Sequence, residues 1–258
     1  MYLRYLLGVA VAIPTLPIMY WHGKKILAAV PKLPDATGPA GEVGEGRPFR
    51  LLAIGESTFA SVGVKTQEEG FTAALAQVLA EELKSRVSWK IYARSGYTAA
   101  RLNETVLPEI TETEADLIVI GTAGNDAFKL TQPWNFRKDV AYMIAFLQAR
   151  FPGTPVAFAN IPPIKEFPAF TPLIKWTIGN LVEWHGKELR KLTDQYSGVI
   201  FNDEIIHLKP WAKELNLEED PTAFFSDGVH PSGLTYQVWG KNFGAFVLGS
   251  GVLGPQRD

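Results

Sequence analysis

The sequence predicts an α/β protein, a three-layer α/β/α sandwich with a central parallel sheet of about five strands. Two observations predict this class. From residue 48 onward, short apolar runs alternate with longer stretches that carry apolar residues at helical spacing. The short runs are apolar at nearly every position, which is typical of parallel strands that helices cover on both faces.

The expected elements follow one another along the chain. Strands are predicted at residues 50–55, 89–96, 115–121, 154–161 and 198–203. Helices are predicted at residues 71–86, 98–110, 135–150, 172–196 and 233–248. Pro108 interrupts the second of these helices, because proline has no N–H to donate inside a helix.

An apolar segment precedes this alternating region. Residues 5–21 carry no charge, with Arg4 before them and Lys24 and Lys25 after them. As one helix they would span ~25 Å, slightly less than a ~30 Å hydrocarbon core, and Pro14 and Pro17 would kink it. We predict a membrane anchor in residues 1–30. A cleaved signal peptide and a core or interfacial helix remain alternatives.

Residues 31–47 are rich in proline and glycine and show no periodicity, which predicts a linker. The expected organisation is therefore an anchor at 1–30, a linker at 31–47 and a globular domain at 48–258. We expect the protein to be membrane-associated, or secreted or periplasmic if the first segment is cleaved. The nearly balanced positive charges on the two flanks leave the orientation open.

Composition excludes several functions. The chain is 47% hydrophobic and 20% charged, which excludes global disorder, and its net charge of -2 gives no basic excess for a nucleic-acid partner. It has no cysteine, so disulfides, thiolate zinc sites and a cysteine nucleophile are ruled out. The four histidines are dispersed and no phosphate-binding loop lies between a strand and a helix. We expect no metal and no cofactor.

Polar residues and glycines follow three of the predicted strands. Ser57 follows the first strand, Gly96 ends the second and Asn125 follows the third. The carboxyl ends of parallel strands meet at one edge of a sheet, where functional groups gather. A polar loop near the C-terminus adds Asp227 and His230, three residues apart.

These residue types fit nucleophilic catalysis. His230 would accept the proton of the Ser57 hydroxyl, and Asp227 would orient the imidazole. The backbone N–H groups of Ser57 and Gly96 and the Asn125 side-chain amide would stabilise an oxyanion. Each residue alone is common in turns and helix caps, so it is their order and placement that favour a site.

This order resembles the SGNH, or GDSL-type, hydrolase family. Ser57 lies in LLAIGESTFA, Gly96 in ARSGYTA, Asn125 in GTAGNDAF and His230 in SDGVHPSG. The resemblance covers about residues 48–248. It implies a flavodoxin-like fold and assigns Asp227, three residues before the histidine, as the third member of a Ser-His-Asp triad.

Two positions depart from the family's pattern. Glu56 stands where the family usually has Asp, and Ala123 stands where it usually has Gly. We expect activity to be retained, with altered hydrogen bonds around Glu56 and a site narrowed by the Ala123 methyl group. The other histidines lie outside the matched blocks: we expect His22 at an interface, His185 in packing and His207 without a site role.

The predicted function is hydrolysis of an acyl ester of a lipid or lysophospholipid. The chain is most similar to a lysophospholipase-like subset of the family with an apolar N-terminal segment and a PxLP linker, here residues 31–34. Residues 161–176 are apolar and proline-rich, and they wall an acyl pocket, form a membrane-facing lip or make buried connecting structure. A carbohydrate O-acetylesterase, an acyltransferase, a thioesterase and a catalytically silent membrane-tethered binding protein remain alternatives.

Overall fold

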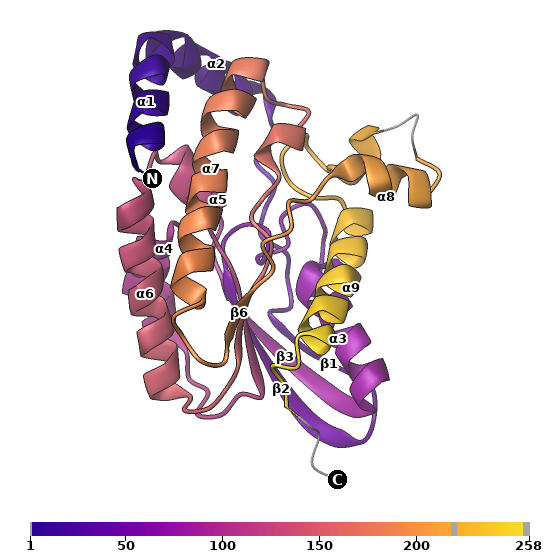
Figure 1. Ribbon diagram of the computed structural model, residues 1–258. Coiled ribbons are helices and arrows are strands. Elements are labelled where there is room, and N and C mark those ends of the chain that lie inside the picture. The colour runs from indigo at the N-terminus through magenta and orange to yellow at the C-terminus, as the bar shows by residue number, and fades with distance from the viewer. Residues whose placement is uncertain (1, 218–220, 255–258) are drawn as a thin grey trace.

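The computed structural model describes residues 2–217 and 221–254 and places a six-stranded sheet between layers of helices (Figure 1). The strands lie in the spatial order β1-β3-β2-β4-β5-β6, with β1 antiparallel to β3 and every other pair parallel. The parallel strands follow the flavodoxin-like order, which confirms the predicted fold class. The strands are β1 (Ala40–Val43), β2 (Arg47–Gly55), β3 (Ser85–Ala93), β4 (Leu117–Gly121), β5 (Val156–Phe158) and β6 (Val199–Phe201).

Helices cover both faces of the sheet. On one face α3 and α9 pack together, and on the other face lie α6 and α7 (Figure 1). The helices are α1 (Tyr2–Ala12), α2 (Leu16–Ala29), α3 (Phe71–Leu83), α4 (Ala99–Arg101), α5 (Gly124–Phe128), α6 (Pro133–Arg150), α7 (Pro172–Thr193), α8 (Leu208–Glu214) and α9 (Gly233–Gly249). Most of the predicted helices and strands are therefore present, with shifted ends.

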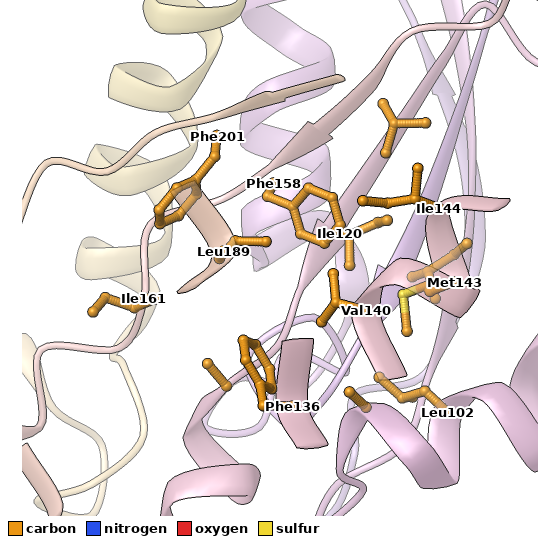
Figure 2. Packing of buried hydrophobic residues seen from close by; sticks show 14 of the residues in the cluster. Leu102, Ile120, Phe136, Val140, Met143, Ile144, Phe158, Ile161, Leu189 and Phe201 are labelled. Atoms are coloured by element: carbon orange, nitrogen blue, oxygen red, sulfur yellow. The ribbon is translucent and has the colours of Figure 1, made fainter. Parts of the chain in front are cut away.

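Alternation along β2 divides the core into two clusters. Leu51 and Ala53 point to the α3 and α9 face, whereas Leu52 and Ile54 point to the α6 and α7 face. Figure 2 shows the second cluster, in which Phe136 and its neighbours on α6 face the apolar side chains of β4 and β5. Burial on both faces explains why these strands are apolar at every position.

The predicted linker differs from the structure. Ala40–Val43 form the edge strand β1, and Gly41 pairs with Trp89 of β3. A Cβ at Gly41 would collide with the Trp89 indole, so the glycine lets the ring lie against the edge strand. Glycine-rich composition therefore indicated a linker where the chain forms a sixth, half-exposed strand.

The predicted helix at 98–110 also differs. Only α4 is a regular α-helix; a π-helical turn at Leu102–Val106 and a 3-10 turn at Leu107–Glu109 follow it. Pro108 lies in the last turn, where its missing N–H prevents a continuous helix. The preceding helix, α3, ends early because Lys84 adopts a left-handed conformation with φ 48°, and β3 begins at once.

Where the sequence predicted one membrane-spanning helix, the structure has two shorter ones. A 3-10 turn at Ile13–Thr15, which contains Pro14, separates α1 from α2. Across residues 2–217 and 221–254, no helix combines the length and the apolar character needed to cross a membrane.

Candidate active site

Ser57 lies in a tight turn at the carboxyl end of β2. A Cβ at Gly55 would meet the Gly121 carbonyl oxygen at 2.6 Å, so only glycine fits where β2 passes β4. The Phe59 N–H then donates to the Glu56 carbonyl at 2.9 Å and turns the chain. Ser57 is partly exposed, and within the described residues its hydroxyl makes no hydrogen bond.

Asp227 and His230 form a hydrogen-bonded pair in the loop before α9. His230 Nδ1 lies 2.7 Å from Asp227 Oδ2, and Oδ1 accepts the backbone N–H groups of Val229 at 2.9 Å and His230 at 2.7 Å. Gly228, with φ 85°, lets the loop close this tightly. The Asp227 side chain is 0% exposed and the His230 side chain 21% exposed.

The charge of Asp227 is stabilised by these bonds. Burial by itself would raise the pKa of Asp227, but the hydrogen bonds from the His230 ring, His230 N–H and Val229 N–H outweigh it and lower the pKa. An ionised carboxylate only accepts hydrogen bonds, so Nδ1 of His230 carries the hydrogen. The other ring nitrogen is then left to accept a proton.

The Ser57 turn and the His230 loop pack against each other. Gly63, a few residues after Ser57, lies against the Pro231 carbonyl, where a Cβ would clash. Thr58 and Pro231 also line one pocket. The structure thus brings the two predicted segments together, although no hydrogen bond between the Ser57 hydroxyl and the His230 ring is present among the described residues.

Asn125 is held by Glu56. The Glu56 side chain is buried, and its Oε2 accepts the Asn125 N–H at 2.8 Å and the Asn125 Nδ2 at 2.7 Å. Its Oε1 accepts the Gly124 N–H at 2.8 Å. A carboxamide has two N–H hydrogens, so Asn125 keeps a second one for another acceptor.

The environment of Glu56 shifts its titration toward neutrality. Burial, together with the nearby Asp126 charge, raises the pKa of Glu56 to about 7, against the opposing effect of the hydrogen bonds from Asn125 and Gly124. Three N–H donors, one from Gly124 and two from Asn125, therefore bind the Glu56 carboxylate and link the end of β2 to α5.

Gly96 lies in an exposed turn after β3 and has φ 80°, a conformation that favours glycine. A buried carboxylate connects this loop to α5: Asp126 Oδ2 accepts the Ala99 N–H at 2.9 Å. Burial raises the pKa of Asp126 to about 6. The sequence did not predict this role for Asp126, because nothing in the local sequence indicates a partner 27 residues away.

The expectation that Ala123 narrows the site is wrong. Its methyl group is fully buried within the core cluster under α6 and α7, away from solvent. Ala123 nevertheless adopts φ 96°, a left-handed conformation that glycine adopts without strain.

The remaining histidines have structural surroundings. His185 is buried, stacks on Phe136 with ring centroids 4.6 Å apart, and lies 2.8 Å from the Thr131 carbonyl oxygen. Burial lowers the pKa of His185 to about 4, so it is neutral, and the packing prediction is confirmed. His207 is exposed beside Glu166. The described residues contain no cluster of three or more metal-ligating side chains.

An apolar pocket adjoins the site. It has a volume of about 30 Å³, and its wall includes Thr58, Pro231, Phe167, Trp211 and Trp239. That volume is about the space of two water molecules. Phe167 belongs to the proline-rich stretch at 161–176, so that stretch forms part of the pocket wall.

The sequence profile of the GDSL-like Lipase/Acylhydrolase family matches residues 53–238, most of the chain and all four predicted sequence blocks. The chain belongs to this family. It is a serine ester hydrolase, as the sequence predicted. No curated protein sequence matches the chain.

Solved structures agree on the fold of this GDSL-like hydrolase. The lipase Lip_vut3 from a goat rumen metagenome has 21% identity and a TM-score of 0.53, over 76% of this chain and 96% of its own. TesA has 21% identity and a TM-score of 0.54, over 80% and 98%. A family two carbohydrate esterase from Clostridium thermocellum, in complex with cellohexaose, has 13% identity and a TM-score of 0.57, over 81% and 66%.

Proposed function

We propose that this GDSL-like hydrolase cleaves acyl esters with Ser57 as nucleophile, His230 as general base and Asp227 as the residue that orients the base. The backbone N–H groups of Ser57 and Gly96 and the Asn125 carboxamide form the oxyanion hole. The observation that carries the proposal is the 2.7 Å contact between Asp227 and His230 Nδ1, which leaves the second ring nitrogen to accept a proton.

The reaction balances with these groups alone. Ser57 Oγ attacks the ester carbonyl carbon while His230 takes its proton, and the oxyanion hole stabilises the negative oxygen. The intermediate collapses to an acyl-enzyme, and the alcohol leaves with the proton from His230. Water then gives a proton to His230 and attacks the acyl carbon, which releases the carboxylic acid and restores Ser57.

For the substrate we propose an acyl ester of a lipid, such as a lysophospholipid. The support is the wholly apolar, aromatic wall of the pocket beside Thr58 and Pro231, because it offers an acyl chain contacts without polar groups to desolvate. Apolar side chains also remain exposed near the site, with Phe128 and Leu130 in the segment that follows Asn125. We also propose that the protein associates with a membrane, and this proposal does not depend on the catalytic residues.

The size of the pocket favours a second candidate, an acetylesterase acting on a carbohydrate. A volume of about 30 Å³ holds a group of about two or three heavy atoms. An acetyl group fits that space as it is. A long acyl chain requires the aromatic wall to open or the chain to extend over the exposed apolar surface.

Hydrolysis of p-nitrophenyl acetate, butyrate, octanoate and palmitate separates these candidates. We compare the wild-type protein with Ser57→Ala and with a control, Ser197→Ala. The control alters an exposed serine before β6. Turnover lost in Ser57→Ala alone supports the nucleophile, and unchanged turnover contradicts it. A maximum at octanoate or palmitate supports the lipid ester, and activity confined to acetate supports the acetylesterase.

A further inference from the structure

The N-terminal arm, defined as residues 2–29 with α1 and α2, exposes an apolar surface. Seven of the fourteen large hydrophobic side chains exposed among the described residues belong to it. Ile13 is 57% exposed and Ile18 is 53% exposed. Exposed apolar side chains that gather in one region mark a surface that binds a partner or a membrane. The seven are Leu6, Val9, Ile13, Leu16, Ile18, Tyr20 and Trp21.

The arm is fixed to the domain by its other side. The Tyr5 ring makes an edge contact with Trp134, with centroids 5.7 Å apart, and another with Trp184 at 6.3 Å. His22 Nδ1 lies 3.2 Å from the Thr171 hydroxyl, at the first turn of α7. The arm therefore presents its apolar side chains from a defined place on the domain.

That place is the site end of the molecule. In Figure 1 the arm, coloured indigo, lies across the end where α7 begins. The chain reaches this end after the carboxyl end of β5, and the carboxyl ends of β2 and β4 carry Ser57 and Asn125. A surface that covers the apolar side chains of the arm would therefore face the same end of the domain as the predicted site.

The positive charge of the arm favours an anionic partner. Lys24 Nζ lies 4.9 Å from the centroid of the Tyr20 ring, and Lys25 Nζ lies 3.5 Å from that of Trp21. Residues 2–34 contain no Asp or Glu. Tyrosine, tryptophan and lysine beside exposed aliphatic side chains match the headgroup region of an anionic bilayer.

We propose that the N-terminal arm docks the protein on the surface of an anionic lipid bilayer, lying in the plane of the interface. A second copy of the chain is a poorer occupant, because a symmetric contact would bring Lys24 and Lys25 toward the same residues of the partner. Delivery of a lipid ester to Ser57 from that bilayer rests on the proposed function; the docking itself does not.

Sedimentation with vesicles tests the docking. The full chain is mixed with phosphatidylcholine vesicles that contain or lack phosphatidylglycerol. We expect binding to the anionic vesicles, and its loss in the double variant Ile13→Glu/Ile18→Glu. Tyr142→Glu on α6, 58% exposed in the native chain, is the matched control and should bind as wild type. Lys25→Glu should bind about tenfold more weakly, and Lys241→Glu on α9 should not.

Labelling gives a second measurement, because the chain has no cysteine of its own. A polarity-sensitive fluorophore on Ile18→Cys should shift to shorter wavelength when anionic vesicles are added. The same label on Tyr142→Cys should not shift. Hydrolysis of p-nitrophenyl acetate should be the same in all arm variants as in wild type, which shows that the domain is folded.

Three results would overturn the docking: wild-type protein that stays in the supernatant, arm variants that bind as wild type, or a label at Ile18→Cys that does not shift. Concentration-dependent self-association without lipid that Ile13→Glu/Ile18→Glu abolishes would instead assign the surface to a second copy. If Ser57→Ala leaves turnover unchanged while vesicle binding persists, the proposed catalytic function fails and the docking stands.

Discussion

Glu56 Oε2 accepts both the backbone N–H and the side-chain amide of Asn125, at 2.8 and 2.7 Å. The residue before the predicted nucleophile thereby fixes the orientation of a predicted oxyanion donor on α5. Because Glu56 also belongs to the Ser57 turn, the position of the nucleophile and that of Asn125 are coupled through one carboxylate.

Asn125→Ala should lower kcat by about 10²–10³ with little change in KM, because the lost donor stabilises the negative oxygen mainly in the transition state. Steady-state hydrolysis of a p-nitrophenyl ester measures both constants. Asn135→Ala, at an exposed position on α6, is the control and should leave both unchanged. A rise in KM without a fall in kcat would remove Asn125 from the oxyanion hole.

Glu56 should make the protein less stable as pH rises from about 4.5 to about 7. The pKa of Glu56 is raised from 4.5 to about 7, so in this window the unfolded chain loses a proton that the folded chain keeps. Urea unfolding at several pH values, for wild type and Glu56→Gln, measures the effect. The free-energy difference between the two proteins should change across the window, and a constant difference would contradict the assignment.

Asp227→Asn should lower kcat by about 10³–10⁴, because an amide N–H placed against His230 Nδ1 forces the wrong tautomer. The lowered pKa of Asp227 also adds stability above its unfolded value of 3.8, which is lost as pH falls through the folded value. In urea unfolding, the free energy of unfolding of the variant should lack this decrease at acid pH. Full activity in the variant would contradict the role of Asp227 in orienting His230.

Ala123→Gly should raise the free energy of unfolding by about 1 kcal/mol, because glycine adopts φ 96° without strain. Chemical denaturation measures the change. Gly153→Ala is the reverse control: Gly153 has φ 80° and open space around its Cβ position, so that substitution should cost about 1 kcal/mol through backbone strain alone. A destabilised Ala123→Gly would mean that burial of the methyl group outweighs its strain.

The sequence predicted the parallel strands because burial on both faces makes them apolar throughout, as at Ile118 and Val119. It did not predict β1, since an exposed edge strand with a glycine under Trp89 has no apolar pattern. Ser57, Gly96, Asn125 and His230 were found as candidates from their order and placement.

The supports of the site were harder to predict. Glu56 and Asp126 act through Asn125 and Ala99, which are remote in sequence, so only the folded chain shows the contacts. The position of the N-terminal arm was equally hard to predict. Pro14 indicated the kink between α1 and α2. The contact of Tyr5 with Trp134, which holds the arm on the domain, depends on tertiary structure.

The packing of α3 against α9 joins two parts of the chain that are far apart in sequence. Gly240 on α9 lies against the Phe71 carbonyl on α3, and the Tyr236 hydroxyl donates to the Val62 carbonyl, 174 residues away, at 2.8 Å. Contacts of such long sequence separation slow folding, because the entropy of closing the long intervening loop opposes them. Ser57 lies far before His230 in the chain, so a growing chain contains the proposed nucleophile well before the proposed base. The proposed hydrolysis of an ester requires both residues, and it therefore requires the α9 end of the domain to be in place.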